Sequence, residues 1–386
     1  MKISKRVTQI PPSGIRAFFE LVLGRPDVIS LGVGEPDFDT PWTVRESAIY
    51  AIEKGRNSYT SNKGLIELRK AISEYLQSQY QMLYKAEDEI LITVGVSEAM
   101  DLALRTILEP GDKVIIPDPC YVSYAPLTTL VGAEPILLST LNNNFKIDPK
   151  ALSVILKQKP KAIVLNYPSN PTGISYKYEE LLAISELLAE HDTYIITDEI
   201  YDKLTFNYKH TPFPTLPGMK EKTIYLNGFS KAYAMTGWRI GYAAAPANVI
   251  EGMTKIHQYS MLCAPIQGQF AALEALQNAE EQTQEMKRSY VQRSRFLRSA
   301  LDEIGLTSPS PDGAFYLFVN IMASKMESFA FAQELLQEEN VAVVPGNAFG
   351  PSGEGYVRMS YATDIELLKE AVKRISAFLK RKTKHA

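Results

Sequence analysis

Cysteine and histidine are scarce in this sequence of 386 residues, and its net charge is close to zero. The two cysteines, Cys120 and Cys263, are too few for a disulfide framework and do not form a CxxC pair. The four histidines are far apart, without an H-E-x-x-H motif or a Cys/His cluster, so we expect no bound metal. Basic residues number 41 and acidic residues 44, which gives a charge of −3 and argues against a nucleic-acid partner.

Long apolar runs are also missing. No stretch approaches the roughly 18 residues of a membrane span. The basic residues 1–6 are followed by Pro11 and Pro12, where a signal peptide would need its apolar segment. We therefore expect a cytoplasmic protein without a membrane partner. An apolar content of 45% is ordinary for a globular chain, and the length predicts two to three domains.

Helical periodicities alternate with short apolar runs from about residue 44 to residue 245. The predicted helices cover residues 44–54, 65–80, 97–108, 149–158 and 178–190. The predicted strands cover residues 89–94, 113–116, 161–166, 194–197, 223–227 and 239–245. Alternation at this spacing predicts an α/β fold with a mostly parallel central sheet and helices on both faces.

The pattern changes after about residue 248. A long helical region over residues 264–304, broken near Asn278, precedes a smaller α/β portion with strands at 314–319, 341–344 and 355–359 and helices at 329–339 and 364–380. We expect three parts: an N-terminal segment (1–44) that packs with the small domain, a large cofactor-binding domain (45–285) and a small C-terminal domain (286–386).

Ligands of open α/β sheets bind outside the carboxyl ends of the strands, so the residues that follow each predicted strand are candidates for a site. Small, polar or turn-forming residues follow five of these strands, at 95–99, 117–121, 166–173, 198–201 and 228–231. A purely structural sheet has no need of such sequences. A binding site at this edge is therefore predicted.

Lys231 and Asp198 follow two of these strands. A lysine at the mouth of a parallel sheet can lose solvation and become a nucleophilic amine, although a surface lysine is the ordinary alternative. Asp198 could cap a helix, or it could face a protonated ring nitrogen. A Schiff-base lysine and an aspartate partner for a pyridinium nitrogen are the pair that pyridoxal phosphate requires.

A phosphate site is predicted where residues 95–99 join a strand to a helix, since backbone N–H groups and the Ser97 hydroxyl can face an anion there. Arg239 could supply a cation, although a structural ion pair is the alternative. Asn170, before Pro171, and Tyr201 could donate to a phenolate oxygen, and Tyr121 could stack on a ring.

Together these motifs resemble those of the class I/II aminotransferases of the fold-type I pyridoxal phosphate enzymes, and within them the bacterial and archaeal aspartate and aromatic aminotransferases. The resemblance extends over residues 30–363. It includes LGVGEPDF (31–38), YTSNKG (59–64), NPTG (170–173), SKAYAMTGWRIG (230–241) and VRMSYA (357–362).

The resemblance implies a role for each matching residue. Lys231 would form the Schiff base with pyridoxal 5'-phosphate, Asp198 would pair with the ring nitrogen, and Asn170 and Tyr201 would bond the ring hydroxyl. The remaining cofactor contacts would come from Tyr121, Val96, Ser97, Ser230 and Arg239, with Lys231, Asp198 and Tyr201 as the catalytic set. Gly34, Tyr121, Asn170 and Arg358 would bind the substrate. Tyr59 would reach the phosphate of a neighbouring subunit, which implies a homodimer. Gly228 departs from the pattern, because some members have a second phosphate-binding serine there.

The expected reaction is transfer of an amino group from an L-amino acid, aspartate or an aromatic one, to a 2-oxo acid such as 2-oxoglutarate, with ping-pong kinetics. A C–S β-lyase of the same fold would use the same lysine, aspartate and arginine and stays open as an alternative. A ligand-sensing regulator would need a DNA-binding module, for which the pattern leaves no room. Ile15, Arg16 and Phe18 lie in a segment that often borders the side-chain pocket, or they serve only in packing.

Overall fold

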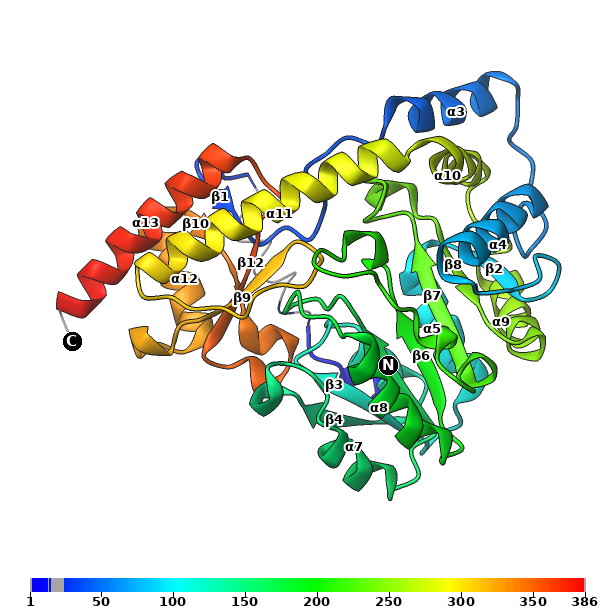
Figure 1. Ribbon diagram of the computed structural model, residues 1–386, viewed down its shortest axis with the longest axis horizontal. Coiled ribbons are helices and arrows are strands. Elements are labelled where there is room, and N and C mark those ends of the chain that lie inside the picture. Colours follow the sequence, from blue (N-terminus) through cyan, green and yellow to red (C-terminus); the bar gives the residue numbers. More distant parts are fainter. Residues whose placement is uncertain (1, 13, 15–23, 385–386) are drawn as a thin grey trace.

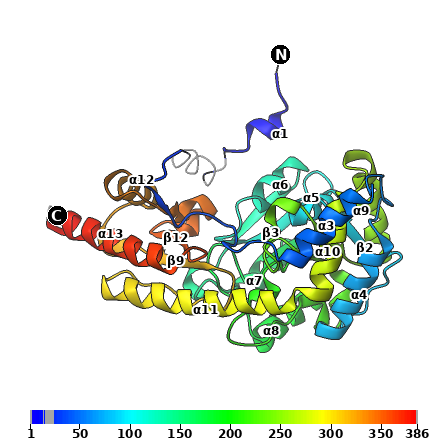
Figure 2. The same ribbon diagram turned by 90° about the horizontal axis from the view of Figure 1, so that it is seen from above.

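The structure, a computed structural model, describes residues 2–12, 14 and 24–384. The described residues form a seven-stranded, a three-stranded and a two-stranded sheet, and α11 (Glu280–Glu303) extends from the side of the largest sheet to the helices of the smaller part (Figure 1). Among the described residues, no helix is long and apolar enough to cross a membrane. Helix α1 (Lys5–Thr8) lies against α6 at the edge of the molecule (Figure 2).

Seven strands form the larger sheet in the order β2-β8-β7-β6-β5-β3-β4. Strand β8 is antiparallel to both of its neighbours, and the other pairs are parallel. The strands are β2 (Ile90–Thr93), β3 (Lys113–Asp118), β4 (Glu134–Ser139), β5 (Ala162–Asn166), β6 (Tyr194–Asp198), β7 (Thr223–Gly228) and β8 (Gly241–Ala244). The central strands are rich in buried Ile, Val and Leu because helices cover both faces of a parallel sheet.

Alternate residues of each strand pack against opposite helical layers. Ile224 and Leu226 of β7 belong to the core under α5 (Gly95–Ile107) and α9 (Ala247–Ser260), together with α6 (Tyr124–Leu130). Tyr225, between them in the sequence, belongs to the core under α4 (Ile66–Tyr80), α10 (Ile266–Asn278) and α3 (Trp42–Glu53). Helices α7 (Pro149–Leu156) and α8 (Tyr178–Ala189) cover the same face further along.

The smaller part contains an antiparallel sheet of β9 (Tyr316–Asn320), β12 (Tyr356–Ser360) and β11 (Val344–Pro345), with α12 (Ser328–Glu339) and α13 (Ile365–Lys384). Strand β1 (Ile29–Ser30) pairs in parallel with β10 (Val341–Ala342), so residues near the N-terminus lie beside the C-terminal part. The expected boundary at residue 285 falls inside α11. No end of a helix marks this boundary, so the division of the chain into segments 1–44, 45–285 and 286–386 remains a proposal.

The predicted α/β fold with a mostly parallel central sheet is confirmed, and so is the break near Asn278, where α10 ends and α11 begins two residues later. Five α-helices and strands of the described residues were not predicted: α1, β1, β4, α6 and α9. Strand β4 is at the edge of the sheet, contains Pro135 and is largely accessible to solvent, so it lacks the continuous apolar run of a buried strand. The strand predicted at 341–344 is divided between β10 and β11.

Candidate active site

A cavity of about 800 Å³ lies at the carboxyl ends of the parallel strands and is lined by residues of both parts of the chain. The lining includes nine of the ten residues predicted to hold the cofactor, namely Val96, Ser97, Tyr121, Asn170, Asp198, Tyr201, Ser230, Lys231 and Arg239. It also includes Gly34 and Arg358, which were predicted to bind the substrate. Tyr59 does not line this cavity and is 81% exposed. Ile15, Arg16 and Phe18 lie outside the described residues.

Lys231 follows β7 and is partly buried at the cavity wall. Its Nζ donates a hydrogen bond of 2.6 Å to the carbonyl oxygen of Gly34, in the segment between β1 and α3. Burial lowers the pKa of Lys231 to about 8, and nearby Glu35 opposes this shift. The amine is therefore not an ordinary surface lysine, and it has an appreciable neutral fraction near neutral pH.

Asp198 is the last residue of β6 and its side chain is buried beside the cavity. The Tyr124 hydroxyl donates to Asp198 Oδ2 over 2.8 Å, and the Ile200 N–H donates to Oδ1 over 3.3 Å. Burial raises the pKa of Asp198 to about 6, although both hydrogen bonds favour the charged form. Because the next helical turn begins after Tyr201, Asp198 is not a helix N-cap. Its carboxylate is available to a cationic group in the cavity.

The first turn of α5 has the features of an anion-binding site. Val96 and Ser97 lie there, after Gly95, which has a φ of +73°. A Cβ on Gly95 would lie 2.5 Å from Arg239 Nη2, so the guanidinium sits directly over this turn. In the described part of the chain, no carboxylate forms an ion pair with Arg239, and its Nη1 donates to the Thr236 carbonyl over 2.9 Å. The N-terminus of α5 and the arginine together suit a phosphate.

Gly228 occupies a tight position at the end of β7. A Cβ there would lie 2.9 Å from the Cα of Gly241 and 3.0 Å from the carbonyl oxygen of Ile240. Strand β8 leaves no ordinary space for a side chain at this point. The backbone is therefore closely packed at the position where some family members have a second serine.

Arg358, in β12, is almost fully buried and reaches the cavity from the smaller sheet. Its Nη1 donates to Asn170 Oδ1 over 2.8 Å and its Nη2 donates to the Gly32 carbonyl over 2.6 Å, while Nε has no partner among the described atoms. No carboxylate of the described residues pairs with it. Desolvation lowers the pKa of Arg358 from its ordinary value. A buried guanidinium without an internal counterion suits a carboxylate ligand.

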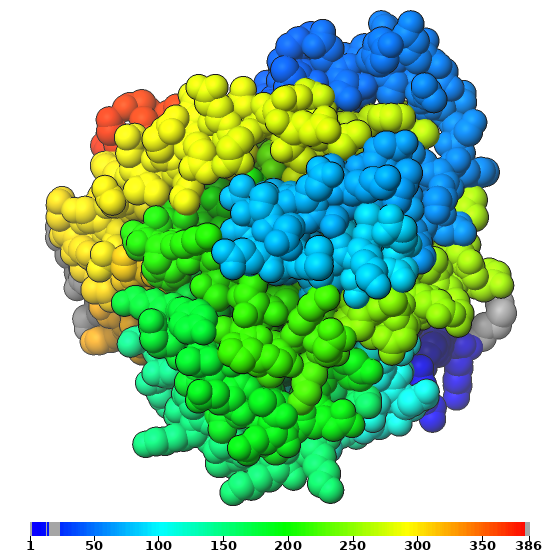
Figure 3. All heavy atoms as spheres, turned by 45° about the vertical axis from the view of Figure 1, so that its right-hand side comes forward, coloured from blue at the N-terminus to red at the C-terminus, as the bar shows by residue number. Residues whose placement is uncertain are grey.

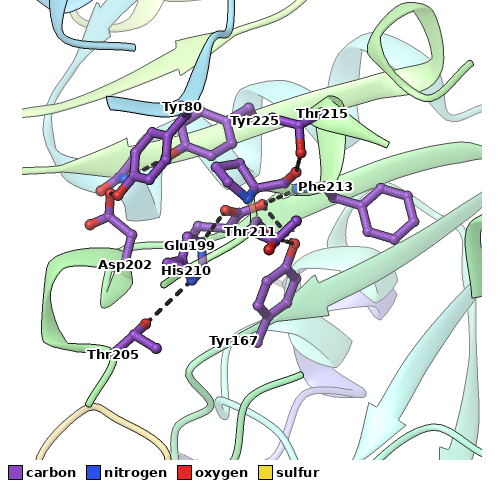
Figure 4. Close-up of polar contacts among 12 residues, drawn as sticks. Tyr80, Tyr167, Glu199, Asp202, Thr205, His210, Thr211, Phe213, Thr215 and Tyr225 are labelled. Carbon is purple, nitrogen blue, oxygen red and sulfur yellow. Dashed lines mark hydrogen bonds and ion pairs between the residues drawn. The ribbon is translucent and has the colours of Figure 1, made fainter. Parts of the chain in front are cut away.

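The adjacent acidic residues Asp198 and Glu199 lie on two different sides of the sheet. Glu199 is fully buried away from the cavity, where Figure 4 shows its carboxylate among polar groups. Oε1 accepts from the Tyr167 hydroxyl (3.1 Å) and the Phe213 N–H (3.0 Å), and Oε2 lies 2.6 Å from His210 Nε2. Tyr167 precedes the loop of Asn170 by three residues. This network supports the rear of the site.

Several cavity residues were not among the predicted site residues, and three of them carry polar side chains that matter for the argument: Tyr124, Tyr316 and Glu35. The Tyr316 hydroxyl lies 3.0 Å from the Tyr201 hydroxyl, and its ring lies under the Arg358 guanidinium at 4.4 Å from the centroid. With 21 tyrosines in the chain, residue type alone could not single out these two. Glu35 belongs to the GEPDF motif (34–38), and this motif is the sequence signal that could have identified it.

The donor set of the cavity fits pyridoxal 5'-phosphate. An amine of lowered pKa suits an aldehyde, a buried carboxylate suits a protonated ring nitrogen, and the turn over which Arg239 lies suits a phosphate. Tyr201 and Asn170 line the same cavity and carry donors for a ring oxygen. The four requirements of the cofactor are met by groups that line one cavity.

Comparison with known proteins agrees with this fit. The sequence pattern of the family "Aminotransferase class I and II" matches residues 26–375. The chain is 50% identical over 382 residues to YugH of Bacillus subtilis (strain 168), and 42% identical over 386 residues to the aspartate aminotransferase of Pyrococcus abyssi; both alignments cover 99% of each chain. The crystal structure of an aromatic aminotransferase from Pyrococcus horikoshii OT3 has a TM-score of 0.91 at 40% identity, covering 96% of this chain and 99% of the other. The protein is therefore a pyridoxal-phosphate-dependent enzyme and belongs to the class I and II aminotransferases.

Proposed function

We propose that the protein transfers the amino group of an L-amino acid to a 2-oxo acid by a ping-pong mechanism. The proposed donor is aspartate or an aromatic amino acid, and the proposed acceptor is 2-oxoglutarate. The observation that carries this proposal is that Lys231, Asp198 and Arg358, from three separate segments, line a single cavity. The names of the relatives from Pyrococcus abyssi and Pyrococcus horikoshii support the two substrate classes.

Each residue has a defined task in this proposal. When bound, pyridoxal phosphate supplies an electron-accepting ring next to the carbon that loses its proton. Lys231 would hold the cofactor at its aldehyde carbon, and its free, neutral amine would accept the substrate Cα proton. In the cofactor-free protein, burial lowers the pKa of this amine to about 8, which favours its neutral form.

The other groups orient and stabilise. The buried carboxylate of Asp198 would hold a proton on the ring nitrogen, since an opposite charge nearby favours the charged form of both groups. Arg358 binds the substrate α-carboxylate with two N–H groups, which fixes the direction of the Cα–H bond. Asn170 and Tyr201 donate to the ring oxygen. Ser97, Ser230 and Arg239 would hold the phosphate together with the backbone at Val96, and Tyr121 would contact the ring.

The test begins with covalent attachment. Borohydride treatment of the purified holoenzyme, digestion and mass mapping should place a pyridoxyl group on the peptide of Lys231, and Lys231→Ala should lack it. No adduct at Lys231 in the wild type would contradict the proposal.

Kinetics then tests the reaction. A screen of amino acids with 2-oxoglutarate should yield glutamate, with parallel double-reciprocal lines for the favoured donor. Intersecting lines would exclude the ping-pong order. Release of pyruvate and ammonia from cystathionine without any 2-oxo acid would instead identify a C–S β-lyase.

We further propose a cytoplasmic homodimer in which Tyr59 reaches the neighbouring subunit's phosphate. Helix α3 lies at the outer edge of the molecule, where the blue segment protrudes (Figure 3). It exposes large apolar side chains: Trp42, Ile49, Tyr50 and Ile52 are between 46% and 63% accessible. An apolar surface of this kind favours association. Sedimentation equilibrium tests the dimer, and cell fractionation tests the location.

A further inference from the structure

Tyr316 contacts two groups of the cavity with two different parts of its side chain. It is the first residue of β9 and is fully buried. Tyr316 pairs with Ser360 of β12, and Arg358 pairs with Phe318, so Tyr316 and Arg358 are diagonal neighbours on one face of the sheet. This register explains why the Tyr316 ring lies 4.4 Å from the Arg358 guanidinium carbon.

The Tyr316 hydroxyl lies 3.0 Å from the Tyr201 hydroxyl. Each phenol has one proton, so only one of the two can donate to the other. If Tyr201 gives its proton to the ring oxygen of the cofactor, its own oxygen is left to accept from Tyr316. A donor that is itself a hydrogen-bond acceptor becomes a stronger donor, because the two bonds polarise each other.

The position of the Tyr316 hydroxyl is restricted from another side. A Cβ at Gly34 would lie 3.0 Å from this hydroxyl and 3.8 Å from Arg358 Nη2. Gly34 is also the residue whose carbonyl accepts from Lys231. The segment of Gly34 therefore packs close to Tyr316 and limits where its hydroxyl can move.

We propose that Tyr316 is a positioning residue with two separable effects: its hydroxyl directs the Tyr201 proton to the ring oxygen of the cofactor, and its ring holds Arg358 in place for the substrate α-carboxylate. The inference rests on the proposed function, because it needs the cofactor on Lys231. It assigns Tyr316 no contact with the reacting atoms.

Two substitutions separate the effects. Tyr316→Phe removes one oxygen and keeps the ring, whereas Tyr316→Leu removes both. In the holoenzyme without substrate, the absorbance of the lysine-bound cofactor titrates with pH. In Tyr316→Phe the midpoint should move upward by roughly 0.5 to 1 pH unit. Without Tyr316 the Tyr201 hydroxyl donates more weakly to the ring oxygen of the cofactor. The proton shared between that oxygen and the Lys231 nitrogen is then held more tightly and is lost at a higher pH. Binding of carboxylates should change less than about twofold, because the ring remains under Arg358.

Tyr316→Leu should show the same spectral change and, in addition, weaker carboxylate binding. The probes are 3-phenylpropionate and succinate, which lack an amino group and report binding through the same absorbance. Loss of the ring under Arg358 should raise their dissociation constants about 3- to 30-fold. An unchanged dissociation constant in Tyr316→Leu would overturn the second effect.

Tyr361→Phe is the matched control. Tyr361 is another fully buried tyrosine of the same core, and its hydroxyl donates to the Ala314 carbonyl over 3.3 Å. It does not line the cavity. The control should lose similar thermal stability without a shift of the titration midpoint. An equal shift in Tyr361→Phe and Tyr316→Phe would show a general structural effect and overturn the proposal.

A double-mutant cycle tests whether Tyr316 acts through Tyr201. Tyr201→Phe should raise the midpoint, and adding Tyr316→Phe should shift it no further. Additive shifts would overturn the proposal, as would an unchanged midpoint in Tyr316→Phe beside a changed one in Tyr201→Phe. Failure of the proposed function is a different result: the wild type would then carry no titrating chromophore and no pyridoxyl group on Lys231.

Discussion

Asp198 and Glu199 are adjacent acidic residues at the end of one strand, yet they have opposite surroundings. Glu199 faces the interior, where Tyr167, Phe213 and His210 surround its carboxylate with three polar contacts. Asp198 faces the cavity with one hydroxyl and one longer N–H contact, and burial raises its pKa to about 6. The carboxylate with complete internal contacts holds the fold, and the one with spare acceptor capacity is available to a ligand.

The same contrast separates two buried arginines. Arg69, in α4, donates to the carbonyl oxygens of Gly64, Ala86 and Glu87, which satisfy it from within the chain. Arg358 faces the cavity, and its Nε has no partner among the described atoms. Burial alone therefore does not identify the site. Incomplete partnering of a buried charge beside a cavity does.

The largest expected effect comes from exchanging the two carboxylates for amides. Asp198→Asn should lower kcat by about 10²-fold or more, because the ring nitrogen loses the group that keeps it protonated. Glu199→Gln should keep most of the activity of the folded fraction but lose about 1–3 kcal/mol of unfolding free energy, since it disturbs a satisfied buried network. Steady-state kinetics of the loaded enzymes and urea denaturation measure the two effects. Similar losses of kcat in both variants would remove the distinction.

The raised pKa of Asp198 also predicts a pH-dependent stability. In the cofactor-free native state, the Asp198 carboxyl loses its proton near pH 6. In the unfolded chain the same carboxyl loses its proton near pH 4. The native state binds more protons between these values, so the unfolding free energy falls as pH rises from about 4 to about 6, by about 3 kcal/mol from this group. Asp198→Asn lacks this decrease. Urea denaturation of wild type and variant across that range tests it, and parallel curves would refute it.

Replacing each of the two arginines, Arg358 and Arg69, with lysine tests the same comparison for buried cationic side chains. Arg358→Lys should raise KM for the amino acid about 10- to 100-fold, because an ammonium cannot bind a carboxylate with two parallel N–H groups. Arg69→Lys, its matched control, should leave KM unchanged and lower the unfolding free energy instead. Kinetics with one donor amino acid and denaturation of both variants supply the measurements. A raised KM in Arg69→Lys would mean that the distinction between internal and cavity-facing arginines is wrong.

The sequence predicted most of the sheet because buried parallel strands are continuous apolar runs, as in Ala162–Asn166 and Thr223–Gly228. Strand β4 escaped prediction because an edge strand needs no such run. Lys231, Asp198 and Arg358 could be identified from motifs, and the structure brings them to one cavity. Tyr124 and Tyr316 could not, because their roles depend on which tyrosines approach Asp198 and Tyr201 in three dimensions. Strand alternation predicts that Asp198 and Glu199 face opposite sides, but the partners that surround Glu199, Tyr167 and His210, become apparent only in three dimensions.

The smallest expected effect concerns Tyr59, which lies outside the cavity and is 81% exposed. If a neighbouring subunit supplies it to the phosphate, Tyr59→Phe should raise the dissociation constant of pyridoxal phosphate only about 2- to 10-fold, the effect of one hydrogen bond. Ser97→Ala, within the cavity, provides the comparison from the same subunit. Fluorescence titration of the cofactor-free variants measures both constants. The Tyr59 effect should disappear in a dissociated monomer while that of Ser97 remains; if the Tyr59 effect persists in a monomer, the residue does not act across a subunit interface.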